Sequence, residues 1–339
     1  MNRLPLIVHY LWLGLVLSLC SSITLAQEQT SRPTVEPKSL GGDERGLELL
    51  VLGTAQDAGY PQAGCWKACC SPVWQDPSRG RFPTSIALLD HANKKRWLFD
   101  CTWQLPAQLQ TLQVQLPRED SPGIDGIFLT HGHIGHYTGL MHLGREVMGS
   151  QNVPVYAMPR MTQFLKKNGP WSLLVELENI AIQQLAAGKA VKLTDRVQVT
   201  PIEVPHRGEF SETVGFLIKT DGQSVLYLPD IDKWSRWETK IEEVLRTVDL
   251  AFLDATFFQD GEIPGRNMSE IPHPFVEESL LRFQGLPASE RAKIHFIHLN
   301  HTNPALDENS NAAQQIRRAG MHLAKQGEIY SLEKRTPNR

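Results

Sequence analysis

Three histidines of the chain lie within six residues of one another, at His131, His133 and His136. They follow the apolar run 126–129, which predicts a buried strand, and the glycines between them allow a tight turn. Neutral imidazole is a common ligand of zinc and similar metals. A lone histidine is more often a surface or packed residue, but three at this spacing lack a ready structural explanation. The cluster therefore predicts a transition-metal site, with zinc the favoured metal.

A second cluster consists of Cys65, Cys69 and Cys70. Adjacent cysteines bond to each other only with strain, so a metal knuckle explains this spacing better than a disulfide does. Disulfide-paired or free cysteines remain the alternative, because an exported protein meets an oxidising compartment. Cys101, beside Asp100, is predicted to be a small buried residue.

The elements that must position these side chains are short apolar runs with helical stretches between some of them. The runs that predict strands are 47–52, 85–89, 97–99, 126–129, 197–204, 214–218, 225–228, 250–253 and 294–297. The stretches that predict helices are 139–148, 161–167, 236–247, 274–283 and 309–324. This mixture, without strict alternation, indicates an α/β or α+β sandwich and not a barrel.

Several polar positions come directly after these predicted strands. Thr130, Pro205, Pro229 and His298 are the residues at which these apolar runs end. We therefore expect the polar residues around them to gather along one edge of the sheets.

Charge and composition narrow the class of partner. The 339 residues are 41% hydrophobic, and 34 basic against 37 acidic side chains give a net charge of -3. The sequence has no run of basic residues that would create a positive electrostatic potential for phosphate groups. A small-molecule substrate is therefore favoured over nucleic acid. The sequence leaves the oligomeric state open.

Residues 1–26 are typical of a signal peptide, with Arg3, an apolar run at 11–19 and mainly small residues at 21–26. Cleavage after Ala26 would leave a polar linker at 27–46 and one domain at 47–339. The apolar run is shorter than the ~20 residues needed to span a bilayer, and no later segment is long and apolar enough. The mature protein is thus expected to be exported, periplasmic or secreted, without a stable membrane span. A lipoprotein starting at Cys20 is less favoured because Leu19 is bulky, and an uncleaved anchor is the other alternative.

The histidine cluster resembles the signature of the metallo-β-lactamase superfamily, H-x-H-x-D-H at the end of a strand. Later parts of that pattern follow in order, at His206, Asp230 and His298. The resemblance spans about 47–334 and implies a four-layer αβ/βα sandwich with metal at the sheet edge. It also implies a ligand set in which the first metal is held by His131, His133 and His206, the second by His136 and His298, with Asp230 between them.

Gly135 departs from that pattern, because the superfamily usually has an aspartate there that binds the second metal. The second site is therefore expected to be weaker than the first. Gly135→Asp is expected to tighten it if the backbone tolerates a side chain.

Within the superfamily, the chain looks most like the pyrroloquinoline-quinone biosynthesis protein B group and related phosphodiesterases. The segments 52–62 and 298–304, with Cys65, carry this likeness. It implies that Cys65, Cys69, Cys70 and His301 hold a structural zinc, which adds folding energy and needs no open position.

The resemblance implies a hydrolase in which metal-activated water attacks an ester, amide or phosphodiester bond. Asp230 and His298 are the predicted catalytic residues, and one or two zinc ions are expected at the active site. The alternative is a non-hydrolytic protein, either a redox enzyme or a module that binds or carries a quinone-like molecule. Imidazole-rich sites accept iron as readily as zinc, so iron is an alternative metal.

Overall fold

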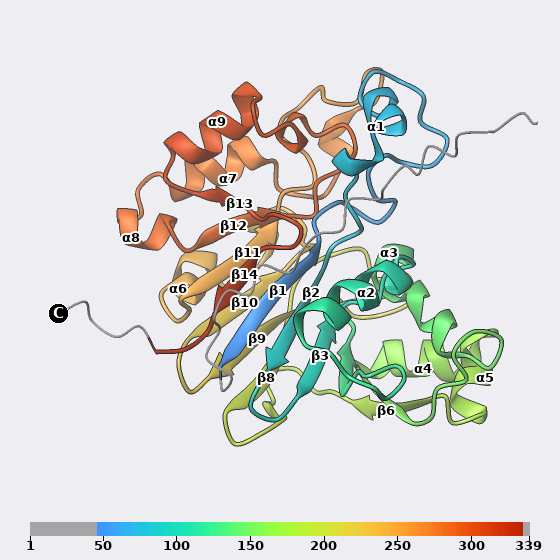
Figure 1. The fold of residues 1–339 in the computed structure, drawn as a ribbon. Helices are drawn as coiled ribbons and strands as arrows, with labels where there is room; N and C mark the ends of the chain where they lie inside the picture. Colours follow the sequence, from blue (N-terminus) through green and yellow to red (C-terminus); the bar gives the residue numbers. More distant parts are fainter. Residues whose placement is uncertain (1–45, 335–339) are drawn as a thin grey trace, which may run out of the picture. The chain divides into compact units, whose positions relative to one another are not determined.

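Two β-sheets lie face to face, with helices along their outer sides (Figure 1). The computed structural model describes residues 46–334, which fall within one compact unit. The predicted signal peptide at 1–26 lies outside the described residues, and so does the linker up to residue 45. Within the described part, no helix has the length and apolar character needed to cross a bilayer.

The first sheet has the strand order β14-β1-β2-β3-β4-β5-β6. Its strands are β1 (Leu47–Gly53), β2 (Ser85–Asp90), β3 (Lys95–Phe99), β4 (Gly126–Phe128), β5 (Val153–Ala157), β6 (Ile180–Gln184) and β14 (Ile329–Ser331). The second sheet has the order β13-β12-β11-β10-β9-β8-β7. Its strands are β7 (Val191–Lys192), β8 (Val197–Glu203), β9 (Val214–Thr220), β10 (Ser224–Leu228), β11 (Leu250–Asp254), β12 (Ile294–Ile297) and β13 (His322–Leu323).

Helices cover the outer face of each sheet. The α-helices of the described part of the chain are α1 (Ser71–Gln75), α2 (Leu105–Gln115), α3 (Ile134–Tyr137), α4 (Pro159–Lys167), α5 (Trp171–Glu176), α6 (Ile241–Leu245), α7 (Val276–Phe283), α8 (Ala288–Arg291) and α9 (Asn311–Arg318). Apolar side chains of α2, α4 and α5 form one core with the first sheet, and those of α6, α7 and α9 form another with the second. The order of layers is that of the expected αβ/βα sandwich.

A third core fills the space between the sheets, where aromatic rings from both sides meet. Phe99 and Phe128 of the first sheet stack at 5.0 Å between ring centroids, and Phe216 of the second sheet packs edge-on against both. Strands buried on both faces read as continuous apolar runs, which is why β1, β2 and β11 were visible in the sequence.

The strands that lead into the candidate site run in the same direction within each sheet. In the first sheet, β1 and β3 are both antiparallel to β2, and β3 is parallel to β4. In the second sheet, β10, β11 and β12 are parallel, and β8 shares their direction because both β8 and β10 are antiparallel to β9. The ends of β1 and β12 meet in a bridge between Ala55 and Leu299. Polar residues that follow these strands therefore converge on one edge, as expected.

Several predicted elements differ from the structure. Instead of a helix over 139–148, a 3-10 turn at Thr138–Leu143 is followed by turns. The helix predicted over 309–324 ends at Arg318, since Gly320 adopts a φ of 78° and the chain turns into β13. Strands β5 and β6 were missed, and β5 contains Pro154, a residue that argues against a central strand.

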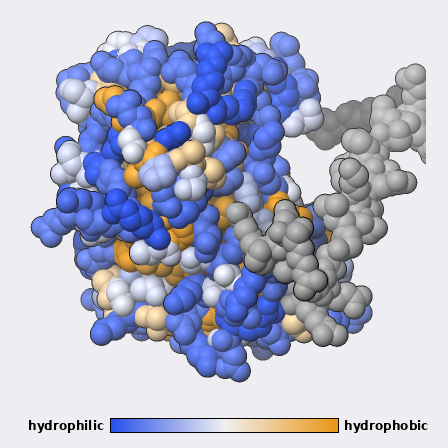
Figure 2. Space-filling model, turned by 90° about the vertical axis from the view of Figure 1, so that its left-hand side faces the viewer, coloured by the Kyte–Doolittle hydropathy of each residue, from blue (hydrophilic) through white to orange (hydrophobic). Residues whose placement is uncertain are grey.

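The face drawn in Figure 2 is mostly hydrophilic, with apolar side chains interspersed among polar ones. Scattered apolar side chains are normal on the surface of a globular protein and indicate no particular partner.

Candidate metal centre

His131, His133, His206 and Asp230 form the first cluster of metal-type ligands, as the sequence predicted. One ligand atom from each lies within 4.8 Å of the others. Asp230 Oδ2 is 3.2 Å from His131 Nε2 and 3.9 Å from His133 Nδ1, and Asp230 Oδ1 is 3.3 Å from His206 Nε2. The aspartate thus faces all three imidazoles, in the arrangement of a single metal site.

The remaining nitrogen of each imidazole in this cluster contacts a supporting oxygen. His131 Nδ1 lies 2.9 Å from Thr130 Oγ1, and His133 Nε2 lies 3.2 Å from Glu209 Oε2. His206 Nδ1 donates to Asp232 Oδ1 at 3.1 Å. Such contacts fix the tautomer and the ring orientation, and they point the other nitrogen of each ring toward the ligand position. Neither Glu209 nor Asp232 is among the site residues predicted from the sequence.

His136 and His298 form a second cluster, which also contains Asp57. His136 Nε2 lies 3.3 Å from His298 Nε2 and 3.0 Å from Asp57 Oδ1. Asp57 was missed as a ligand, although it lies inside the 52–62 segment that carries the family likeness. Asp230 groups with the first cluster, and its predicted place between two metals remains a prediction.

In the second cluster, too, the Nδ1 atom of each imidazole contacts a supporting oxygen. His136 Nδ1 donates to Asp100 Oδ2 at 2.8 Å, and His298 Nδ1 lies 2.9 Å from Thr256 Oγ1. Asp100 and His298 have φ values of 66° and 69°, in the left-handed region that non-glycine residues rarely adopt. Backbone of this kind persists where the surroundings enforce it, and it is concentrated at functional sites.

His273 lies beside the first cluster and was not predicted. Its Nδ1 is 2.8 Å from Asp254 Oδ2 and 3.1 Å from Asp230 Oδ1. Asp254 is fully buried and also accepts hydrogen bonds from Thr256 N and Oγ1. In the sequence, His273 is distinguished only by lying between two prolines, in a segment that forms neither a strand nor a helix.

The donor atoms fit a metal, because several that face the cluster centres lack another partner. Among the described residues, His206 Nε2, Asp230 Oδ1 and Asp57 Oδ1 are buried without a contact of hydrogen-bond geometry, although each lies within 3.3 Å of another ionisable group of the site. Buried polar atoms are otherwise almost always paired. Nitrogen and carboxylate oxygen are also the ligand types that zinc and iron accept.

Without a cation, the buried charges shift the pKa values of the site in opposing directions. Burial lowers the pKa of His206, but Asp230 and Asp232 raise it to about 9. Burial likewise opposes protonation of His273, whose pKa Asp254 and Asp230 raise to about 10. Burial raises the pKa of Asp230, but His206 and His273 hold it well below its usual range. The metal-free site thus favours protonated His206 and His273 beside Asp230, and metal binding by His206 should release a proton.

Gly135 has no room for a side chain. A Cβ atom there would lie 2.4 Å from Asp57 Cα and 2.4 Å from Asp57 Oδ1. The expected effect of Gly135→Asp depended on the backbone tolerating a side chain there, and this condition is not met.

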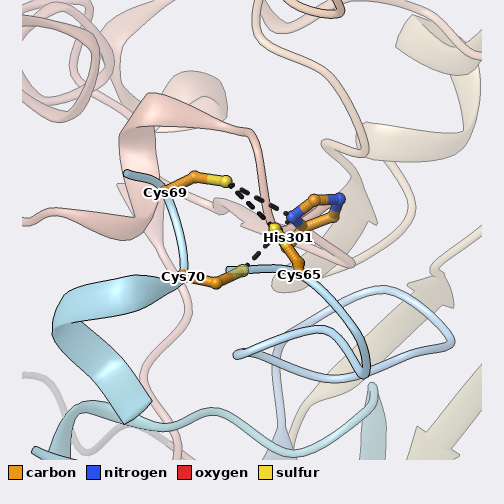
Figure 3. Close-up of side chains that lie close together, drawn as sticks. All are labelled: Cys65, Cys69, Cys70 and His301. Atoms are coloured by element: carbon orange, nitrogen blue, oxygen red, sulfur yellow. Dashed lines mark hydrogen bonds between the residues drawn. The ribbon is translucent and has the colours of Figure 1, made fainter. Parts of the chain in front are cut away.

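Cys65, Cys69, Cys70 and His301 come together in a separate cluster (Figure 3). Cys65 Sγ lies 3.6 Å from Cys69 Sγ, and His301 Nδ1 lies 3.6 Å from Cys69 Sγ and 3.3 Å from Cys70 Sγ. Tetrahedral zinc, with bonds of about 2.3 Å to sulfur and about 2.0 Å to nitrogen, places such atoms about 3.5–3.8 Å apart. All four cysteines of the described range are free thiols, and Cys101 is fully buried, as predicted.

A family model described as "Beta-lactamase superfamily domain" matches residues 95–296 of the chain. Among curated relatives, "Coenzyme PQQ synthesis protein B" of Xanthomonas campestris pv. campestris (strain B100) is 26% identical over 312 residues, covering 84% of this chain and 100% of the relative. The protein of the same name from Methylorubrum extorquens (strain PA1) is 25% identical over 306 residues, covering 83% and 98%.

Two solved structures have a similar fold. Zinc-bound PqqB from Methylobacterium extorquens gives a TM-score of 0.72 at 22% identity, covering 84% of this chain and 99% of that one. A diphosphatase from the PhnP family gives a TM-score of 0.59 at 24% identity, covering 84% and 98%. At these identities, the two structures establish the fold.

Proposed function

Because the chain belongs to the metallo-β-lactamase superfamily, a family of metal-dependent hydrolases, we propose that it hydrolyses an ester, amide or phosphodiester bond in a small-molecule substrate. The observation that carries this proposal is the adjacency of two buried clusters of metal-type ligands. The rings of His131, in the first cluster, and His136, in the second, have centroids 4.2 Å apart.

His131, His133, His206 and Asp230 would hold one ion, and His136 and His298 would contribute to holding another. When bound, such ions lower the pKa of coordinated water and polarise the oxygen of the bond to be cleaved. Asp230, buried and facing three imidazoles, is placed to accept a proton from the attacking water. Thr130 and Asp232 keep the imidazole rings oriented, so the site needs little rearrangement during the reaction.

His273 extends this proposal to the leaving group. Its Nδ1 is engaged by Asp254 and Asp230, which leaves Nε2 as the nitrogen that can face a substrate. A histidine held in this way can donate a proton to the departing oxygen or nitrogen.

The test is a substrate panel with zinc-loaded protein, containing bis(p-nitrophenyl) phosphate, p-nitrophenyl acetate and a chromogenic amide. We expect turnover of one class by the natural chain and its loss in the double variant His131→Ala/His133→Ala. His142→Ala is the matched control, because His142 lies nearby in the sequence but belongs to neither cluster. If metal-loaded protein cleaves none of the classes, the hydrolase proposal fails.

The curated relatives favour a second candidate, because they are named for the synthesis of a quinone coenzyme and cover most of the chain. In that case the same imidazoles would hold iron for a redox reaction, or the protein would bind a quinone-like molecule. Protein loaded anaerobically with Fe²⁺ and titrated with pyrroloquinoline quinone tests this candidate. Unchanged absorption spectra of both components would count against it.

We also propose that Cys65, Cys69, Cys70 and His301 hold a structural zinc. The spacing of their sulfur and nitrogen atoms supports this assignment. A site closed by four protein ligands leaves no position for substrate, so its role would be stability.

A further inference from the structure

We propose that Asp57 supplies the carboxylate ligand of the second metal, in place of the aspartate that the superfamily pattern has at the position of Gly135. The inference rests on the proposed metal centre, to which it adds a ligand from a different part of the chain. The carboxylate would come from the turn after β1, whereas the histidines of the signature follow β4.

The position of the Asp57 carboxylate is the first observation. Oδ1 lies 3.0 Å from His136 Nε2 and 3.7 Å from His298 Nε2. Within the described part of the chain this oxygen is buried, and its contact with His136 lacks the geometry of a hydrogen bond. Three ligand atoms thus face one another at the spacing of a metal site.

The space beside Gly135 is the second observation. A side chain at Gly135 would begin 2.4 Å from Asp57 Oδ1, so the carboxylate already occupies the volume that a residue-135 side chain would enter. The Asp57 Cα lies equally close, so the turn and a side chain at 135 exclude each other. The glycine is therefore what allows the turn after β1 to reach the second cluster.

The turn that carries Asp57 is firmly anchored, which is the third observation. Gln56 N donates to Leu299 O at 2.8 Å, directly beside His298, and Trp103 Nε1 donates to Asp57 O at 2.8 Å. Gly59 closes the turn by donating to Gln56 O at 2.7 Å, with a φ of +73° that favours glycine. The carboxylate is thus held in place before any metal binds.

An ion pair with protonated His136 is the competing explanation for the position of Asp57. His136 Nδ1 already donates to the fully buried Asp100, so the ring has a carboxylate partner without Asp57. An ion pair alone predicts that metal content does not depend on Asp57. A ligand role predicts that it does.

The experiment measures zinc content after dialysis and zinc affinity by competition with a chromogenic chelator. We expect three zinc ions in the natural chain, two in the active site and one in the cysteine cluster. Asp57→Asn, which is nearly isosteric, should lose one of the three. Adding His131→Ala/His133→Ala to Asp57→Asn should leave only the ion in the cysteine cluster. Asp76→Asn is the matched control, because Asp76 is exposed and its carboxylate accepts hydrogen bonds from Ser78, outside the metal-ligand clusters.

A second variant tests the same site without altering the carboxylate. Gly135→Ala should displace the turn and also lose one zinc ion, whereas Gly285→Ala, with open space around it, should lose none. An intact cysteine cluster shows that the variants are folded. After Co²⁺ replaces the zinc, the thiolate-to-metal absorption band reports whether this cluster still binds metal.

The inference is wrong if Asp57→Asn keeps three ions with unchanged affinity, or if the natural chain binds only one active-site ion at saturating Zn²⁺. Both readouts are independent of turnover. A protein that binds both ions but cleaves no substrate would contradict the proposed hydrolase and leave the role of Asp57 intact.

Discussion

The fully buried carboxylate of Asp100 accepts a hydrogen bond from His136 Nδ1, with 2.8 Å between the two atoms. This contact places the proton on Nδ1 and leaves Nε2 to bind a cation. Thr130 N and Oγ1 donate to the other oxygen of Asp100, and Tyr227 OH donates to the same oxygen as His136. Asp100 therefore determines the orientation of a ligand without touching the cluster centre.

Asp100→Asn should weaken zinc binding at the second site by about 10–100-fold, the usual effect of removing a partner of a metal-binding histidine. Chelator competition measures this change. Tyr227→Phe, which removes one donor and leaves the carboxylate, should have a smaller effect. Equal affinities in Asp100→Asn and the natural chain would show that His136 needs no such support.

Cys69→Ser should lose about one metal equivalent and lower the melting temperature, because a structural zinc contributes folding energy. Zinc content and thermal melting, compared with those of the natural chain, measure both effects. Cys101→Ala is the control, since that thiol is buried away from the cysteine cluster and its variant should keep all the zinc. If Cys65 is found disulfide-linked to Cys69, Cys70 or Cys101 under denaturing, non-reducing conditions, the structural zinc is ruled out.

His273→Gln should lower kcat by about 10²–10⁴-fold on the substrate that the panel identifies, because the leaving group loses its proton donor. Zinc content should stay the same, and the alkaline limb of the pH–rate profile should disappear. A fall in zinc content together with activity would instead assign His273 to the ligand set. No change in kcat would exclude the proton-donor role.

His295 makes folding stability depend on pH. Burial, with a smaller contribution from His322, lowers its pKa from about 6.5 to about 3. The unfolded chain therefore takes up a proton as the pH falls through about 6.5, whereas the folded protein does so only near pH 3. Because the unfolded state binds more protons in this window, the free energy of unfolding should fall with the pH between these values.

Urea unfolding of His295→Gln from pH 7 to pH 4, a range that covers most of that window, should show a weaker loss of stability on acidification than unfolding of the natural chain. His142→Gln, at a partly exposed histidine, serves as the control and should keep the slope of the natural chain. If the free energy of unfolding changes with pH equally in His295→Gln and in the natural chain, other groups cause the loss of stability in acid.

The sequence predicted His131, His133 and His136 from their spacing after an apolar run, and the resemblance to the superfamily added His206, Asp230 and His298. Each of these residues follows a strand, and the strands end at one edge. Asp57 could not be assigned in this way. Its turn has no periodic pattern, and its role depends on a space beside Gly135 that only the tertiary structure reveals. The missing motif aspartate was visible, but nothing in the sequence pointed to its replacement.

In two regions the local sequence did not predict the structure that forms. The predicted helix over 139–148 contains Gly139 and Gly144, and the chain there forms only a short 3-10 turn. His273 lies in an irregular segment between β11 and α7, where no strand or helix pattern indicates the direction of its side chain. In these regions packing against distant residues, and not propensity, decides the conformation.

The bridge between Ala55 and Leu299 lies on the seam where the two sheets meet, and the two histidine clusters and the cysteine cluster each span that seam. His133, Asp57 and Cys69 belong to segments that follow strands of the first sheet, whereas His206, His298 and His301 follow strands of the second. A bound ion would act as a cross-link between the halves of the sandwich, worth about 4 kcal/mol at a thousandfold excess over its dissociation constant. Where metal is scarce, the protein would lose this contribution to its free energy of unfolding, and a larger fraction of it would be unfolded.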